Sequence, residues 1–214
     1  MKKHAVSLLG IAGGLFMGLL LAAQLAFNEK QNKKSGEPKY VAPKLPEKIS
    51  FAGEPVPLER WDVRERLDRE VLFNYYNVAN ILYMLKLATR YFPVISEKLQ
   101  FNGVPDDFKY LCIAESNLQS GAISRSGAVG YWQFMSYTAP GYNLEISSQV
   151  DDRHNIEKSS DAACQYIKMA YNKFGSWTAA AAAYNCGQGG YNTAATFQQT
   201  TNYYDLQLSE ETNR

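Results

Sequence analysis

Histidine and cysteine are scarce in this chain, and the chemistry that depends on them is correspondingly excluded. Its 214 residues contain only His4 and His154, and three cysteines, Cys112, Cys164 and Cys186. A nucleophilic cysteine needs a base such as histidine beside it. The CxxC spacing that would indicate a metal site is absent. All three cysteines lie among apolar or alanine-rich neighbours, where free thiols behave as small buried hydrophobic groups. We therefore expect no Cys/His site, no metal and no cofactor.

An excess of charge of either sign is also absent. The 22 basic and 21 acidic residues give a formal net charge of +1, which offers no electrostatic basis for binding nucleic acid. Hydrophobic residues make up 46% of the chain, a typical value for a globular protein. The length allows one domain of ordinary size with appendages.

The N-terminal end reads as a membrane or targeting segment. Lys2 and Lys3 precede residues 5–27, which carry no charge. This run exceeds the roughly 7–15 residues of a signal-peptide core and matches the roughly 20 residues that span a bilayer. We expect residues 1–28 to form a signal anchor, with a cleaved signal peptide as the alternative. Residues 29–60 are rich in Lys, Glu and Pro, which predicts an extended linker.

Strand alternation is not found beyond Trp61, whereas apolar residues recur at helical spacing. Pro93 is expected to begin a second helix and Gly103 to end it. The first helix is expected to bury an apolar stripe made of Val71, Tyr75, Val78, Leu82 and Leu85.

Three later helices carry recognisable start and stop signals. "VPDDFKYLCIAESN" follows Pro105, which suits the first position of a helix. Ser159 or Ser160 is expected to cap the helix that ends at Gly175. Ser176 is expected to cap an alanine-rich helix that ends at Gly187. These patterns together predict an all-α domain of about six or more helices.

Glu115 occupies an unexpected face of the helix that follows Pro105. Phe108, Leu111, Cys112 and Glu115 fall at positions i, i+3, i+4 and i+7, so the carboxyl group shares the apolar stripe. Burial penalises the charged form, so the pKa of Glu115 should rise. A glutamic acid that is protonated near neutral pH can act as a general acid. The alternative is a short helix in which Glu115 caps a solvated end.

The segment from residue 115 to 135, "ESNLQSGAISRSGAVGYWQFM", resembles the catalytic motif of the lytic transglycosylase SLT family, glycoside hydrolase family 23. "DDRHNIEKSSDAACQYI" and "FGSWTAAAAAYNCGQGG" resemble two later blocks of that family, so the resemblance covers about residues 104–195. The tail resembles the MltD-like branch. Ser136 stands where the family usually has proline, which puts the local loop shape in doubt. The matched positions of the first block are Glu115-Ser116, Ser124, Gly127-Ala128-Val129-Gly130, Gln133 and Met135.

The resemblance implies an all-α, lysozyme-like fold of the goose-type lysozyme and SLT kind, behind the N-terminal membrane segment. Residues 61–103 would supply the N-terminal helices of the domain. Residues 104–214 would form the catalytic core, which we expect to stop short of the family's last helix. The substrate would be peptidoglycan glycan strands, with the domain on the extracytoplasmic, periplasmic side of a bacterial cell envelope.

The resemblance also implies a reaction with a single carboxyl group. Glu115 would protonate the glycosidic oxygen and then accept a proton from the sugar's own 6-hydroxyl, which gives a 1,6-anhydro product. Ordinary glycosidases use two carboxylates, and only Asp151 and Asp152 lie near the motif blocks. We expect these two to serve as a cap or as ion-pair partners of Arg153.

Five further positions carry over from the family, each with a structural alternative. Ser124 would bind the substrate beside the acid, or serve a turn. Gln133 and Met135 would line the cleft, or act as a structural amide and a packing residue. Tyr184 would orient the catalytic glutamate through its hydroxyl, and Asn185 would bind the acetamido group.

Two rival functions stay open at this stage. A lysozyme-like muramidase would need a second carboxylate that activates water. A non-catalytic peptidoglycan-binding protein would not need to retain Glu115. The sequence indicates contact with the membrane through its N-terminal segment and identifies no protein partner.

Overall fold

The computed structural model describes residues 42–213 of the chain. The anchor expected at residues 1–28 and the first part of the expected linker lie outside these residues. Within residues 42–213, no helix is both long enough and apolar enough to cross a membrane.

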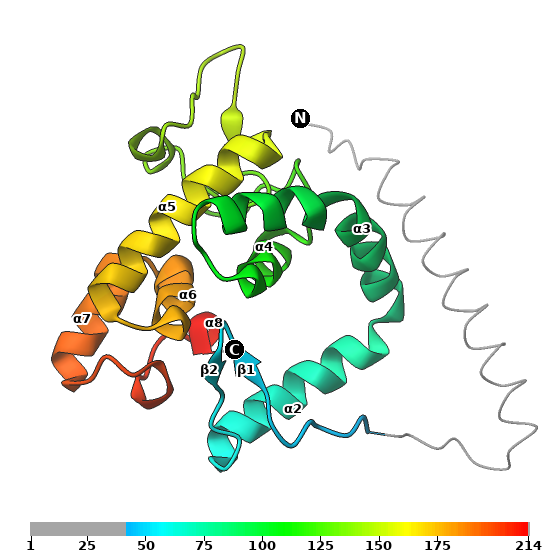
Figure 1. Ribbon diagram of the computed structural model, residues 1–214, viewed down its shortest axis with the longest axis vertical. Coiled ribbons are helices and arrows are strands. Elements are labelled where there is room, and N and C mark those ends of the chain that lie inside the picture. Colours follow the sequence, from blue (N-terminus) through cyan, green and yellow to red (C-terminus); the bar gives the residue numbers. More distant parts are fainter. Residues whose placement is uncertain (1–41, 214) are drawn as a thin grey trace, which may run out of the picture. The chain divides into compact units, whose positions relative to one another are not determined.

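The described residues form a mostly helical domain, which confirms the helical part of the expected fold class (Figure 1). The hairpin of β1 (Ser50–Phe51) and β2 (Glu54–Pro55) pairs antiparallel, with Ser50 opposite Pro55. The α-helices are α2 (Trp61–Tyr76), α3 (Val78–Phe101), α4 (Lys109–Ser116), α5 (Ile156–Phe174), α6 (Trp177–Cys186), α7 (Gln188–Gln198) and α8 (Glu210–Asn213). The short 3-10 helices are η1 (Asp106–Phe108), η2 (Ala139–Tyr142), η3 (Asp152–His154) and η4 (Tyr203–Asp205).

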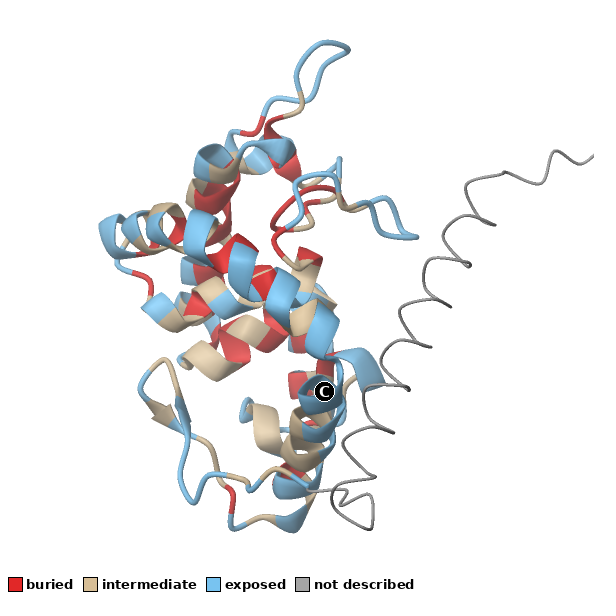
Figure 2. Cartoon of the chain, turned by 90° about the vertical axis from the view of Figure 1, so that its right-hand side faces the viewer, coloured by how far each residue is buried: buried red, intermediate tan, exposed pale blue. Residues whose placement is uncertain are grey.

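The hydrophobic core lies where α5 packs against α3 and α6. Figure 2 shows the buried residues gathered in the interior, between the helices. The small side chains of α6 let it approach α5 closely, because alanine adds little width to a helix. The fully buried side chains here include Ile95, Leu99, Phe108, Cys112, Ala163, Ile167, Ala179, Ala180 and Ala183. Cys112, Cys164 and Cys186 are all free thiols, as expected.

The helix boundary expected at Pro93 is wrong. The helix ends at Asn77 instead, between α2 and α3, and α3 then continues through Pro93 without interruption. Proline removes the hydrogen bond to the carbonyl of Thr89. Pro93 and Thr89 are both exposed, so water can reach this part of the helix and replace the lost bond.

The expected apolar stripe on the first helices is also not buried. Tyr75, Val78, Leu82 and Leu85 are 53%, 47%, 60% and 58% exposed. A different face of α3 enters the core instead. That face consists of Met84, Leu87, Ala88, Ile95 and Leu99. Because this helix is apolar on two faces, periodicity alone could not identify the buried one.

Helix caps agree with the sequence where the signal is local. Ser176 caps α6 by accepting a hydrogen bond from the Ala179 amide at 3.2 Å, and Gly175 ends α5 at a φ of 75°. The cap of α5, however, is Asn155 and not Ser159 or Ser160. Both serines are fully buried inside α5.

Residues 50–60 belong to the folded domain, so the extended linker expected over residues 29–60 does not include them. The Phe51 ring packs on Phe108 with centroids 5.2 Å apart, and the Ala52 amide donates to Asp107 Oδ2 at 2.7 Å. Leu58 is 6% exposed. These contacts attach the hairpin to the segment that leads into α4.

Glu54 joins this hairpin to the N-terminus of α6. Its carboxylate accepts the Trp177 amide at 2.7 Å and the Thr178 amide at 2.9 Å. The hydroxyls of Ser176 and Thr178 donate to it at 2.8 and 2.7 Å. Burial by itself raises the pKa of Glu54, but these hydrogen bonds together lower it below its usual value. The carboxylate is therefore stabilised in its charged form at the positive end of α6.

We predict that Glu54→Gln lowers the free energy of unfolding by roughly 1–3 kcal/mol near neutral pH, because an amide cannot accept all four hydrogen bonds. Since the folded-state pKa is lowered, this stabilisation is present above the unfolded pKa and is lost as pH falls through the folded pKa. Urea denaturation at about pH 7 and about pH 3 checks this. The difference from wild type should shrink in acid, and the exposed control Glu59→Gln should show none.

Candidate active site

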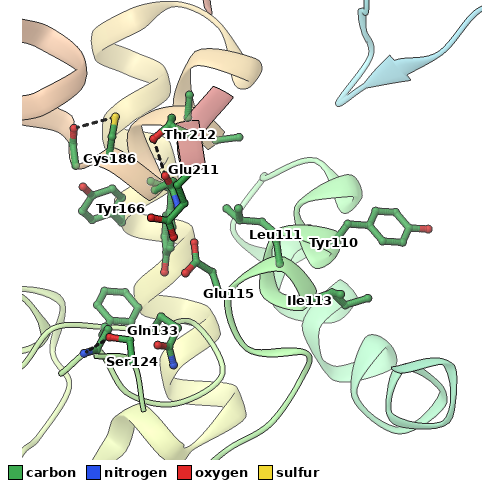
Figure 3. Close-up of a pocket in the computed structure, with 18 of the residues that line it drawn as sticks. Tyr110, Leu111, Ile113, Glu115, Ser124, Gln133, Tyr166, Cys186, Glu211 and Thr212 are labelled. Carbon is green, nitrogen blue, oxygen red and sulfur yellow. Dashed lines mark hydrogen bonds between the residues drawn. The ribbon is translucent and has the colours of Figure 1, made fainter. Parts of the chain in front are cut away.

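A cavity of about 1550 Å³ opens between α4, α6 and the loop after α4 (Figure 3). Residues from α2, α3, α5, α7 and α8, together with β1, η2 and η4, also contribute to its lining. The structure brings all six sequence-predicted site residues to this cavity. They are Glu115, Ser124, Gln133, Met135, Tyr184 and Asn185.

Glu115 lies in the last turn of α4 and is half-buried. Phe108 and Cys112, two turns and one turn earlier, are fully buried on the same side. Burial raises the pKa of Glu115 to about 7, and the negative charge of Glu211 adds to the effect. The carboxyl group therefore exchanges its proton near neutral pH, and Glu115 does not serve as a solvated cap.

The small-residue turn after Glu115 is required by a close backbone approach. Gly130 has a φ of 84°, and a β-carbon there would lie 2.0 Å from the carbonyl oxygen of Arg153. No other residue type fits this position without moving the backbone. The turn is tied to α4, because the Ser116 hydroxyl donates to the Tyr131 carbonyl at 2.8 Å.

The two aspartates near the motif blocks have structural roles, but only Asp151 has the expected cap and ion pair with Arg153. Asp151 caps η3 and forms an ion pair with Arg153, at 2.6 Å between Oδ2 and Nη2. Asp152 is buried, pairs with Lys158 at 2.8 Å and accepts the Glu145 amide at 3.0 Å. The structure thus gives neither aspartate a place in the cavity lining.

Ser124 and Gln133 support the loop and also face the cavity. Ser124 Oγ accepts the Ala128 amide at 3.0 Å, which leaves its hydroxyl proton as a donor for a ligand. Gln133 has a φ of 51°, and its side-chain amide donates to the carbonyls of Ala122 at 3.2 Å and Gly130 at 2.8 Å. Met135 is half-buried beside them.

Tyr184 holds the loop and not the acid. Its hydroxyl donates to the Trp132 carbonyl at 2.8 Å, so it ties α6 to the turn. The ring lies edge-on to Tyr166, with centroids 5.1 Å apart. Burial raises the pKa of Tyr184 well above its ordinary value, and the charge of Glu115 raises it further. The phenol therefore stays protonated close to Glu115, although its hydrogen bond goes elsewhere.

Asn185 is engaged by the C-terminal helix. Its side-chain oxygen accepts a hydrogen bond from the Thr212 hydroxyl at 2.6 Å. Asn185 is otherwise exposed at the cavity, so its amide group can still meet a ligand.

Glu211 is the site residue that sequence reasoning missed. It lies in α8 and lines the same cavity as Glu115, and Figure 3 shows the two carboxyl groups directed toward each other. Ser209 followed by two acidic residues is a local signal for a helix start. That signal says nothing of which distant side chain Glu211 will meet.

The charge in the cavity is of one sign. The described lining contains the carboxyl groups of Glu70, Glu115 and Glu211 and has no lysine, arginine or histidine. A cavity lined in this way favours a neutral or positively charged group over an anion.

Comparisons with known proteins agree with this geometry. The family profile described as "Transglycosylase SLT domain" matches residues 92–207, more than half of the chain. "Membrane-bound lytic murein transglycosylase D" of Escherichia coli (strain K12) is 28% identical over 132 residues, which cover 59% of this chain and 29% of that protein. A protein of Alteromonas sp. (strain M-1) named for tributyltin chloride resistance is 26% identical over 123 residues, 54% of this chain and 59% of that protein. The chain thus spans less than a third of the Escherichia coli relative.

We predict that Glu115→Gln stabilises the fold increasingly as pH rises. The pKa of Glu115 is raised from 4.5 to about 7 in the folded state, so its contribution to stability is complete below about pH 4.5 and is lost as pH rises through about 7. One pKa unit corresponds to about 1.4 kcal/mol, so wild type loses roughly 3 kcal/mol over this range while the amide does not titrate. Thermal unfolding at about pH 5 and about pH 8 measures the difference. Equal pH dependence in both proteins would contradict the burial of Glu115.

We predict that Tyr184→Phe lowers the free energy of unfolding by roughly 0.5–1.5 kcal/mol, because the Trp132 carbonyl loses its donor. Denaturant unfolding measures the effect. Tyr83→Phe removes an exposed hydroxyl on α3 and serves as the matched control. If both variants match wild type, the hydroxyl of Tyr184 does not support the turn.

Proposed function

Because the chain belongs to the transglycosylase SLT domain family, we propose that it is a lytic transglycosylase. It would cleave the β-1,4 bond between MurNAc and GlcNAc in peptidoglycan and leave 1,6-anhydroMurNAc ends. The single observation that carries this proposal is the carboxyl group of Glu115, half-buried at the cavity with a pKa of about 7. A group of that pKa can both donate and accept a proton near neutral pH.

The reaction has two proton transfers through this one group. Glu115 gives its proton to the glycosidic oxygen as the bond between that oxygen and the anomeric carbon breaks. The sugar's 6-hydroxyl then bonds to the anomeric carbon, and its proton returns to the Glu115 carboxylate. No water is consumed, and the acid is regenerated. The acetamido oxygen of the substrate would stabilise positive charge at the anomeric carbon between the two steps.

The cavity suits a glycan strand in size and in charge. Its volume of about 1550 Å³ exceeds the roughly 300–1,000 Å³ of ordinary small-molecule sites. Ser124, Gln133 and Met135 would contact the sugar beside Glu115, and Asn185 would bind its acetamido group. Tyr184 would act by holding the turn that carries Gln133 and Met135.

The same proposal extends to location. The relative's name includes the words "membrane-bound" and "murein", which supports an anchor at residues 1–28 and a place on the extracytoplasmic side of a cell envelope. The N-terminal segment would keep the domain near the membrane while the cavity reaches glycan strands.

A muramidase that uses water is the second candidate, and one observation favours it. Glu211 places a second carboxylate opposite Glu115, and two carboxylates are the usual equipment of a hydrolase. A binding protein without activity has less support, because it would gain nothing from a buried and protonatable Glu115.

Digestion of purified peptidoglycan in ¹⁸O-labelled water separates these candidates. A lytic transglycosylase gives anhydro ends that contain no ¹⁸O, whereas a muramidase gives reducing ends that contain it. Mass spectrometry of the released muropeptides reads the difference. An intact wall after prolonged digestion with the full chain would favour the binding protein.

We predict that Glu115→Gln reduces turnover by roughly 10²–10⁴-fold or more, because the amide can neither give nor take the proton. Muropeptide release by the full chain measures the rate. Glu65→Gln, an exposed change on α2, should retain wild-type turnover. A Glu115→Gln variant with a tenth of the wild-type rate or more would remove Glu115 from the mechanism.

A further inference from the structure

We propose that Glu211 is a positioning residue for Glu115, and that its fixed negative charge keeps the proton on Glu115 until the glycosidic oxygen takes it. This inference rests on the proposed function. It goes beyond it because the reaction as written needs no second carboxylate.

The backbone of α8 is fixed at its start by a helix cap. The Ser209 hydroxyl accepts the Thr212 amide at 3.3 Å, and the Asn213 amide donates to the Ser209 carbonyl at 2.9 Å. These bonds set the orientation of the turn on which Glu211 lies. The backbone from which the Glu211 side chain extends is therefore fixed beside the cavity.

Thr212 attaches this turn to the cavity wall. It is 7% exposed, its hydroxyl donates to Asn185 Oδ1 at 2.6 Å, and its carbonyl accepts the Tyr203 hydroxyl at 3.0 Å. Asn185 follows Tyr184 on α6, so α8 is joined to the wall beside Glu115. Glu211 directly precedes this attachment and lines the open cavity (Figure 3).

The preceding residue, Glu210, is directed away from the cavity. Glu210 points to α2, where its carboxylate lies 3.6 Å from Arg69 with 79% of its side chain exposed. It is not part of the cavity lining. The two neighbouring glutamates therefore carry the same charge on the same turn, but only Glu211 directs it at the acid. This difference makes Glu210 a matched control.

Glu70 and Glu211 are the other carboxyl groups of the described lining, and of these two the charge of Glu211 is the one that acts on Glu115. On α4, burial keeps the Cys112 thiol protonated, because its pKa is raised far above the ordinary value. On α6, the buried phenol of Tyr184 is likewise neutral. Burial is the larger cause of the raised pKa of Glu115, and the negative charge of Glu211 on α8 raises it further. The described lining contains no cation that would cancel this charge.

The charge of Glu211 serves both proton transfers. Before bond cleavage it disfavours loss of the Glu115 proton to solvent. After the proton has gone to the leaving oxygen, two carboxylates face each other, and Glu115 becomes a stronger base for the proton of the 6-hydroxyl. The proton that Glu115 loses in the first step returns to it in the second.

The first test is a titration that needs no turnover. Carboxyl ¹³C NMR of the full chain follows Glu115, with its signal assigned by its absence in Glu115→Gln. Glu211→Gln should lower the pKa of Glu115 by roughly half a unit to one unit. Glu210→Gln and Glu211→Asp should leave the pKa close to that of wild type. Because Glu211 is exposed, high salt should bring wild type toward Glu211→Gln.

The second test is the pH dependence of kcat. If the pKa of Glu115 falls from about 7 to about 6, the protonated fraction at pH 7 falls from a half to about a tenth, so Glu211→Gln loses roughly fivefold in kcat there. At about pH 5 it should match wild type. KM should not change, and the melting temperature confirms that each variant is folded.

These outcomes separate the two proposals. An unchanged titration in Glu211→Gln, or an equal shift in Glu210→Gln, overturns the role of Glu211 and leaves the transglycosylase proposal intact. A loss of kcat that is the same at every pH also overturns it, since a structural or substrate-binding role would act that way. If wild type forms no anhydro ends, the proposed function fails, while the titration still decides whether Glu211 controls the proton of Glu115.

Discussion

The backbone carbonyls of residues 130–134 are the point at which the separate parts of the site are joined. The Tyr131 carbonyl accepts from Ser116 at the end of α4, and the Trp132 carbonyl accepts from Tyr184 on α6. The Phe134 carbonyl accepts from Arg153 at 3.1 Å, and the Trp132 ring nitrogen donates to Ser160 on α5 at 2.9 Å. A single short turn thus fixes three helices relative to one another, because each bond leaves a buried polar group satisfied only in this arrangement.

This junction explains why the site is preorganised. Glu115 directly precedes Ser116. Gln133 lies between Trp132, which is bonded to α6, and Phe134, which is bonded to Arg153. Gly130 is pressed against the Arg153 carbonyl, so the turn cannot slide without a steric clash. Glu115 and the loop residues are therefore positioned by the folded backbone. Under the proposed function, this arrangement would lower the cost of aligning a substrate with Glu115.

The outer wall of the cavity is built differently. Glu54 holds the N-terminus of α6 through four hydrogen bonds, and Thr212 holds its C-terminal end through Asn185. Both contacts come from segments far away in sequence. In the same way, α8 brings the negative charge of Glu211 to the cavity that Glu115 lines, and a like charge nearby changes the pH at which a carboxyl group gives up its proton.

Local patterns in the sequence were sufficient to single out Glu115 as the candidate acid. The spacing of Phe108, Cys112 and Glu115 predicted a carboxyl group on a buried face, and burial then requires a raised pKa. Ser176 and Gly175 were likewise predictable, since a cap or a helix end depends on the few residues beside it. The dense motif between residues 115 and 135 identified the family, because a catalytic turn needs particular residue types at fixed spacing.

Tertiary structure alone decided the remaining features, because each depends on which surfaces meet. The sequence of a helix with two apolar faces does not indicate which face is buried, so the exposure of Val78 and Leu82 could not be foreseen. Ser160 became a buried partner of Trp132 and left the cap to Asn155. The Tyr184 hydroxyl found the Trp132 carbonyl and not Glu115. Glu211 lies 96 residues beyond Glu115 in the sequence, and only the packing of α8 against α6 places its charge opposite the acid.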